Sequence, residues 1–156
     1  VMNTDAEGRL IMADALAYAS ESSPDIICDV ATLTGAAYVA LGVEIGAVFS
    51  NNDSTLKNFL NSNSDGFENY HSLPLEQSYK ALIKSSIADM KNSGGRFGGA
   101  ITASLLLEEF VDDIDWIHLD IAGPGRSRSN TSIYPEGGTG FGVVGYFNFI
   151  KAEANN

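Results

Sequence analysis

The sequence predicts an α/β fold, in three α/β/α layers with a mixed, mostly parallel central sheet. Short apolar runs of strand length alternate along the chain with longer segments of helical periodicity, which is typical of layered α/β sheets. The 156 residues are 44% hydrophobic and 19% charged, enough for one buried core. We find no repeat, linker or low-complexity tract, so we expect a single domain over residues 1–156 with no internal boundary.

The first half of the chain alternates helix and strand. The expected elements are, in order, a helix over Leu10–Ser20, a strand over Ile26–Ala31, a helix over Ala36–Leu41, a strand over Ile45–Phe49 and a helix that begins at Asp53 or Ser54. The first helix is alanine-rich on one face and ends before Pro24, and Gly42 ends the second. We expect the polar segment 61–72 to be a loop.

Glycines separate several of the elements expected in the second half of the chain. The expected elements are, in order, a helix after Pro74, a strand or extended loop over Ser86–Met90, a turn over Gly94–Gly99, a helix over Ala100–Val111, a strand over Trp116–Ile121, a loop over Gly123–Gly140 and a helix over Phe141–Ala152. In the strand that begins at Trp116, one face carries Trp116, His118 and Asp120 and the other is aliphatic. The glycine-rich loop over 123–140 is longer than compact domains usually tolerate without a purpose.

Composition and charge exclude several classes of function. The formal net charge is −11, which repels polyphosphate and argues against nucleic acid as a partner. No apolar stretch reaches the roughly 20 residues of a membrane helix. The single cysteine, Cys28, cannot form an internal disulfide and suits a reducing compartment, so we expect a cytoplasmic protein. Because Val1 opens the chain without a lead-in, we expect the functional unit to be longer.

The segment over residues 3–10, NTDAEGRL, carries the candidate chemistry. If it is extended, Asp5, Glu7 and Arg9 project to one side. Two carboxylates can hold or bridge divalent cations that make hydroxide from water, and the helix start at Gly8 favours an anion. The alternative is an acidic first helical turn with Arg9 in a surface ion pair, and the pattern alone favours this alternative.

NTDAEGRL resembles the signature of the leucyl (cytosol) aminopeptidase family, metallopeptidases with two catalytic zinc or manganese ions. Further blocks of the chain match the family in order: DVATLTGA (29–36), LPL (73–75), SIADMKN (86–92), GGAITA (98–103), WIHLDIAG (116–123) and GTGFGV (138–143). The resemblance covers nearly the whole chain, as the C-terminal part of the family's catalytic domain.

The resemblance implies a role for each matching residue. Asp5 would ligate one metal and Glu7 would bridge both. Arg9 would be catalytic, because it would hold a bicarbonate that acts as general base. The groups implied to complete the site are an anion cradle at Ala6, Gly8 and Leu33 and a substrate pocket at Thr32, Gly35 and Ala122.

One departure from the family limits this function. A lysine ligand, two further aspartates and a second lysine lie upstream of the signature in the family, and this sequence lacks them. Asp5 and Glu7 alone are too few ligands for a tight site, so we expect the isolated chain to be inactive and to bind zinc weakly. The complete enzyme would be a homo-hexamer that cleaves leucine-like residues from peptide N-termini. The alternative is a noncatalytic assembly or binding module.

Three other candidate residues have structural interpretations. We expect His71 to be a solvated surface residue and His118 to be a hydrogen-bonded core histidine. Cys28, in the middle of an apolar strand, is expected to be inert packing.

Overall fold

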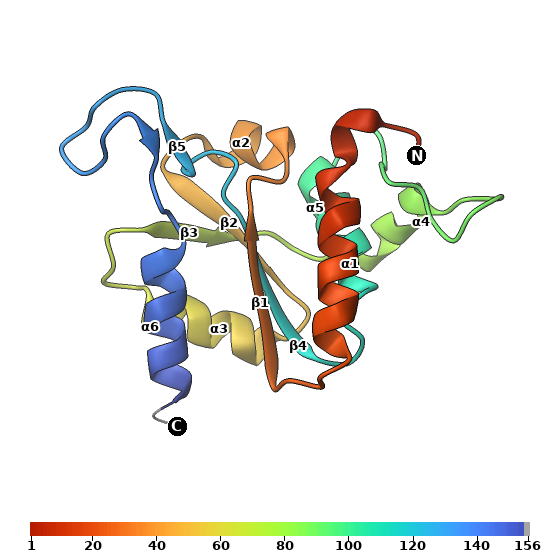
Figure 1. Cartoon of the computed structure of the whole chain (residues 1–156), viewed down its shortest axis with the longest axis horizontal. Helices are drawn as coiled ribbons and strands as arrows, with labels where there is room; N and C mark the ends of the chain where they lie inside the picture. The colour runs from red at the N-terminus through yellow and green to blue at the C-terminus, as the bar shows by residue number, and fades with distance from the viewer. Residues whose placement is uncertain (155–156) are drawn as a thin grey trace.

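A four-stranded sheet lies at the centre of the computed structural model, which describes residues 1–154 (Figure 1). Its strands are β1 (Ile26–Ala31), β2 (Ile45–Ser50), β3 (Asn69–Ser72) and β4 (Asp115–Asp120). The strand order is β1-β4-β2-β3. The β1–β4 and β2–β3 pairs are parallel and the β2–β4 pair is antiparallel. This confirms the predicted mixed, mostly parallel sheet.

Helices cover both faces of the sheet. One layer holds α1 (Gly8–Ser20), α2 (Gly35–Leu41), α4 (Lys80–Ile83) and α5 (Gly99–Glu108), and the other holds α3 (Asp53–Ser62) and α6 (Val143–Glu153). Two 3₁₀ turns, η1 (Thr4–Ala6) and η2 (Gln77–Tyr79), precede α1 and α4, and a short hairpin pairs β5 (Arg126–Ser127) with β6 (Gly137–Gly138). The predicted three-layer α/β/α arrangement is confirmed.

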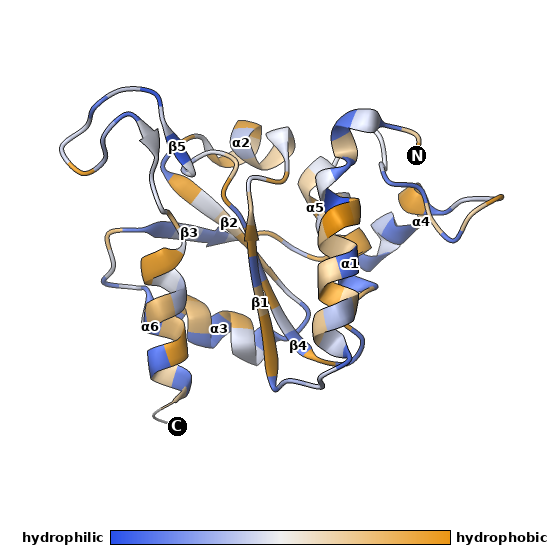
Figure 2. Ribbon diagram, in the orientation of Figure 1, coloured by the Kyte–Doolittle hydropathy of each residue, from blue (hydrophilic) through white to orange (hydrophobic). Residues whose placement is uncertain are grey.

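The alternation of side chains along the strands produces a core on each face of the sheet. Under α1 and α5, Leu16 and Leu105 pack with Trp116. Under α3 and α6, Phe59 and Phe149 pack on the aliphatic face of β4. Figure 2 shows hydrophobic colour on much of β1 and β2 and mostly hydrophilic colour along the hairpin loop. Burying each large side chain stabilises the fold by about 1.5–3 kcal/mol.

Several expected elements differ from the structure. The predicted loop over 61–72 contains the last two residues of α3 and all of β3. The strand was missed because it is an edge strand that is polar and only half buried. Of the two alternatives for residues 86–90, a strand or an extended loop, the structure shows a loop, with an isolated bridge between Lys84 and Met90. The expected helix over 100–111 ends at Glu108, and the loop over 123–140 contains the β5–β6 hairpin.

Polar side chains set the starts of two helices. The Thr34 hydroxyl accepts a hydrogen bond from the Ala37 amide at the start of α2. Asn52, rather than Asp53 or Ser54, caps α3, because its Oδ1 accepts from the amides of the two residues after Asp53.

His118 is the hydrogen-bonded core histidine that the sequence predicts. It is fully buried, and its Nδ1 lies 2.5 Å from Oδ1 of Asp29. The ring stacks against Trp116 and Phe49. His71 is exposed as expected, although it lies in β3.

Cys28 is exposed, so its prediction as a packed core residue is wrong. The cause is the position of β1 at the edge of the sheet, where the alternate side chains of Cys28 and Val30 are exposed. Desolvation by the surrounding groups and the nearby Asp29 carboxylate nevertheless raise the pKa of the thiol to about 12.

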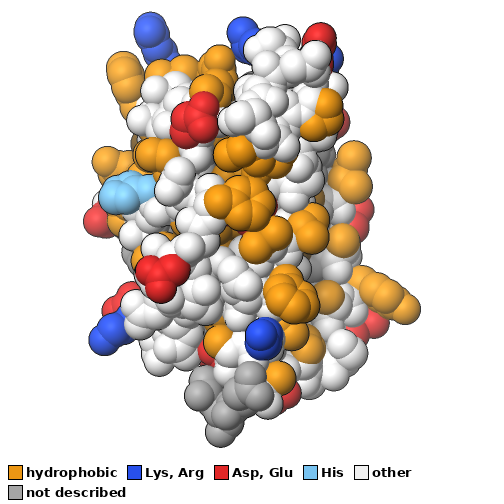
Figure 3. Space-filling view, turned by 90° about the vertical axis from the view of Figure 1, so that its left-hand side faces the viewer, with side chains coloured by type: hydrophobic (Ala, Val, Ile, Leu, Met, Phe, Trp, Pro, Cys, Tyr) orange, Lys and Arg blue, Asp and Glu red, His pale blue; other side chains and the backbone are white. Residues whose placement is uncertain are grey.

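Among the described residues, no helix is both long and apolar enough to cross a membrane. On the outer side of α6, Val143, Phe147 and Ile150 are exposed at intervals of three to four residues. Helix α6 lies on the left of Figure 1, and Figure 3 shows hydrophobic side chains exposed over that side of the molecule.

Candidate metal and anion site

The segment that carries the two candidate metal ligands is a turn and not an extended strand. The Asn3 side chain accepts a hydrogen bond from the Asp5 amide at 2.9 Å, which begins η1. Glu7 has α-helical backbone angles and immediately precedes α1. The prediction that strand-like alternation brings Asp5, Glu7 and Arg9 to one side is therefore wrong about the backbone.

The turn nevertheless brings these side chains to one hollow of about 510 Å³. The hollow lies between the start of α1 and the end of β1. It is lined by Asp5, Ala6, Glu7, Gly8, Arg9, Ile11, Met12, Ala31, Thr32, Leu33 and Gly35. All the residues that the sequence assigns to the site line this hollow except Ala122, which follows β4 and donates its amide to Asp120.

Asp5 and Glu7 are exposed, so both carboxylates are accessible from solvent. Residues 1–154 contain no group of three or more His, Cys, Asp or Glu side chains that could hold a metal ion. Carboxylate oxygens are suitable donors for divalent cations, but two of them leave most of a coordination shell unfilled. The carboxylates of Asp5 and Glu7 therefore fit a metal site but supply only part of its ligands.

Arg9 differs from the surface residue that the alternative interpretation requires. It is 9% exposed, and its buried Nε has no hydrogen-bond partner. Burial lowers the pKa of its guanidinium, and the Asp120 carboxylate partly opposes this effect. Because an unpartnered buried donor is costly, an anion at the start of α1 would stabilise Arg9.

Asn92 holds the segment that carries Asp5. It is 4% exposed, and its Oδ1 accepts from the amides of Met2 (2.8 Å) and Asn3 (3.2 Å). Its Nδ2 donates to the carbonyls of Asn3 (2.7 Å) and Ala6 (3.3 Å). Sequence reasoning missed this role, because an asparagine before a glycine-rich turn is typical of any loop.

Asp120, at the end of β4, holds the other wall of the hollow. Its Oδ1 accepts from the amides of Leu33 (3.1 Å), Thr34 (3.3 Å) and Ala122 (3.2 Å). Its Oδ2 accepts from the Thr34 hydroxyl at 2.6 Å. The only signal in the sequence was an acidic residue on the polar face of a buried strand.

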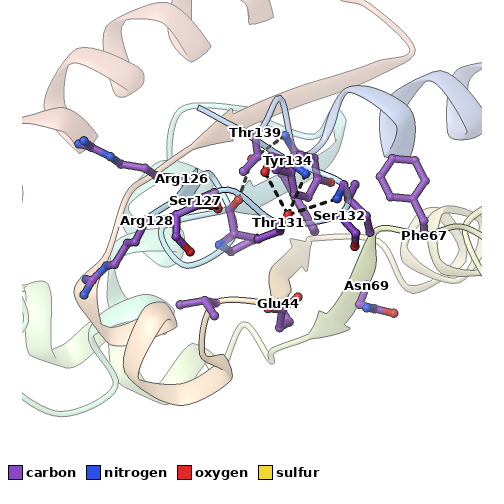
Figure 4. A pocket seen from close by; sticks show the side chains of 15 residues that line it. Glu44, Phe67, Asn69, Arg126, Ser127, Arg128, Thr131, Ser132, Tyr134 and Thr139 are labelled. Carbon is purple, nitrogen blue, oxygen red and sulfur yellow. Dashed lines mark hydrogen bonds between the residues drawn. The ribbon is translucent and has the colours of Figure 1, made fainter. Parts of the chain in front are cut away.

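A second hollow, of about 450 Å³, lies beneath the hairpin loop (Figure 4). Its lining includes Glu44, Phe67, Asn69 and Tyr134, and it shares no residue with the hollow around Asp5. In Figure 4, Arg126 and Arg128 point away from Glu44 and Asn69. None of the residues that the sequence assigns to the site lies here.

Known proteins match this chain over nearly its whole length. Residues 1–146 match the model of the cytosol aminopeptidase family, catalytic domain. A probable cytosol aminopeptidase of Syntrophotalea carbinolica is 52% identical over 98% of this chain and 31% of its own length. One of Prochlorococcus marinus (strain AS9601) is 51% identical over 97% of this chain and 31% of its own.

Solved structures share the fold. A mutant of tomato leucine aminopeptidase superposes with a TM-score of 0.90 and 42% identity, over 96% of this chain and 29% of that one. The bottromycin maturation enzyme BotP in complex with Mn gives a TM-score of 0.89 and 37% identity, over 95% of this chain and 34% of that one. The chain thus spans about a third of the length of these proteins. On the family match and these identities, it belongs to the cytosol aminopeptidase family, a family of peptidases.

Proposed function

We propose that this chain supplies one part of the active site of a metal-dependent aminopeptidase, which removes leucine-like residues from peptide N-termini. One observation carries the proposal: Asp5, Glu7 and the buried Arg9 line the same hollow as Thr32 and Gly35. The two carboxylates suit a cation, and the unpartnered guanidinium donor suits an anion. The wall of small groups suits a peptide beside them.

Each group then has a separate task. Asp5 would hold one divalent ion and Glu7 would contribute to holding two, zinc or manganese, and a relative in complex with Mn supports the second choice. Such ions, when bound, would supply Lewis-acid chemistry for peptide hydrolysis. Arg9, catalytic in this proposal, would hold bicarbonate as the general base, with Ala6 and Gly8 beside it in the hollow.

The other wall of the hollow receives the substrate. Thr32 and Gly35 bound the space for the first side chain of the peptide, and Ala122 adjoins them through Asp120. A Cβ built on Gly35 would meet no atom within 4 Å, which leaves room for an apolar group. The amide of Leu33 donates to Asp120, and Leu33 contributes to the proposed anion cradle by lining the hollow that Arg9 also lines.

The remaining ligands would come from a further part of the same polypeptide, and residues 1–156 would be the C-terminal part of one catalytic domain. The edge position of β1 supports this, because an edge strand presents unpaired N–H and C=O groups that proteins usually cover or protect. Cys28 and Val30 are exposed on this strand, and β1 ends at the hollow. We therefore propose that the further part covers β1 and supplies ligands opposite Asp5 and Glu7.

Complementation tests this function. The 156-residue chain in Mn²⁺ is expected to leave leucine p-nitroanilide intact, because two carboxylates cannot hold the ions tightly. Mixing or co-expressing it with the further part of the polypeptide should restore hydrolysis. Robust hydrolysis by the chain alone, or none by the recombined protein, would contradict the proposal.

The second candidate function is a noncatalytic assembly or binding module. The exposed stripe of Val143, Phe147 and Ile150 on α6 favours a contact between subunits. We propose that the complete peptidase is a cytoplasmic homo-hexamer, consistent with the word cytosol in its relatives' names. Oligomerisation of the recombined protein without hydrolysis would favour the assembly function.

A further inference from the structure

Asp120 is a buried charge beside the proposed site, and its hydrogen bonds lead to the wall of the hollow. It is 1% exposed, and burying a carboxylate without partners would be costly. Three amide N–H groups and one hydroxyl donate to it, and the positive charge of Arg9 is near enough to interact with it electrostatically. Hydrogen bonds to an ionised group are roughly twice as strong as neutral ones.

These bonds join two turns that the sequence separates by more than 80 residues. Leu33 and Thr34 follow β1, Ala122 follows β4, and Asp120 pairs with Ala31 where the two strands end together. The Thr34 hydroxyl continues the network, because it also accepts from the Ala37 amide at the start of α2. One carboxylate thus fixes the turn between Thr32 and Gly35 relative to the sheet.

We propose that Asp120 is a positioning residue, which sets the wall formed by Thr32–Gly35 opposite Asp5 and Glu7. It does not line the hollow, so it acts through Leu33 and Thr34. The effect expected on enzyme kinetics rests on the proposed function, whereas the effect on the structure of the turn does not. Because this wall is proposed to receive the first side chain of the peptide, loss of the network should mainly weaken substrate binding.

Asp120→Asn is the main variant and Asp115→Asn is its matched control. Asp115 begins the same strand, and its carboxylate accepts from Asn52 (3.0 Å) and from the Thr55 hydroxyl (2.9 Å), at the end of β4 away from the hollow. Thr34→Val removes both hydrogen bonds of the Thr34 hydroxyl, the one to Asp120 and the one from the Ala37 amide, with little change in shape. Thr34→Ser keeps the hydroxyl and should recover most of that loss.

The first measurement is amide hydrogen exchange in the 156-residue chain. Asp120→Asn should raise the exchange rates of Leu33, Thr34 and Ala122 by about tenfold or more, whereas Asp115→Asn should leave them unchanged. Equal rates in wild type and Asp120→Asn would overturn the inference. This result does not depend on whether the protein is a peptidase.

The second measurement is steady-state kinetics on leucine p-nitroanilide in the complete peptidase. Asp120→Asn should raise KM about fivefold to tenfold with a smaller change in kcat, Thr34→Val should change KM in the same direction, and Asp115→Asn should change neither. An unchanged KM for Asp120→Asn in an active enzyme would overturn the inference. A wild-type protein without hydrolysis would instead contradict the proposed function, and amide exchange would then decide the role of Asp120.

Discussion

The Asn92→Ala substitution tests whether a single side chain holds the segment that carries Asp5. It removes four hydrogen bonds to the backbone of residues 2–6. At about 0.5–1.5 kcal/mol each, and with Met2 near solvent so that its amide can bind water, the loss should be about 2–3 kcal/mol. Residues 2–6 should become mobile before the core unfolds, because they form the terminal segment that precedes α1.

Two assays measure this effect. Urea unfolding gives the change in stability, and amide exchange over residues 2–6 shows whether that segment is released before the core. Asn130→Ala is the control, since Asn130 accepts a hydrogen bond from the Glu136 amide in the exposed hairpin loop, far from Asp5. A change below about 0.5 kcal/mol with unaltered exchange would refute the positioning role of Asn92.

Three further predictions follow from other sites. A Cβ on Gly145 would overlap the Tyr70 hydroxyl, so Gly145→Ala should destabilise the fold by about 2 kcal/mol or more in urea unfolding, and Gly138→Ala, which meets open space, should not. Because its pKa is raised to about 12, the Cys28 thiol is almost entirely protonated at pH 8, so Ellman's reagent should label it slowly. The labelling rate should rise about tenfold per pH unit up to pH 11. Fast labelling at pH 8 would contradict this prediction. Gly35→Leu should leave stability unchanged but raise KM in the complete peptidase, and an unchanged KM would remove Gly35 from the substrate pocket.

Local patterns in the sequence predicted most of the fold. In β4, alternate side chains sent Trp116 and His118 to one face and the aliphatic residues to the other, as expected. The edge strand β3 was missed because a half-buried strand of polar residues has no clear alternation. The 3₁₀ turn η1 was missed because the Asn3 cap, and not hydrophobic periodicity, determines it.

The candidate site was predictable in its residues but not in its supports. The signature over residues 3–10 identified Asp5, Glu7 and Arg9, and the fold brings them to one hollow. Asn92 and Asp120 support this hollow through hydrogen bonds to residues more than 80 positions away. Such pairings arise from the tertiary fold, so spacing along one chain does not indicate them.

The measurement that tests the account most directly is the dissociation constant of Mn²⁺ for the 156-residue chain, followed by electron paramagnetic resonance. Because Asp5 and Glu7 supply only part of a coordination shell, the constant should be on the order of millimolar. It should weaken further in Asp5→Asn and Glu7→Gln. Binding in the micromolar range, or binding that neither substitution changes, would contradict the claim that this chain carries one part of a peptidase metal site.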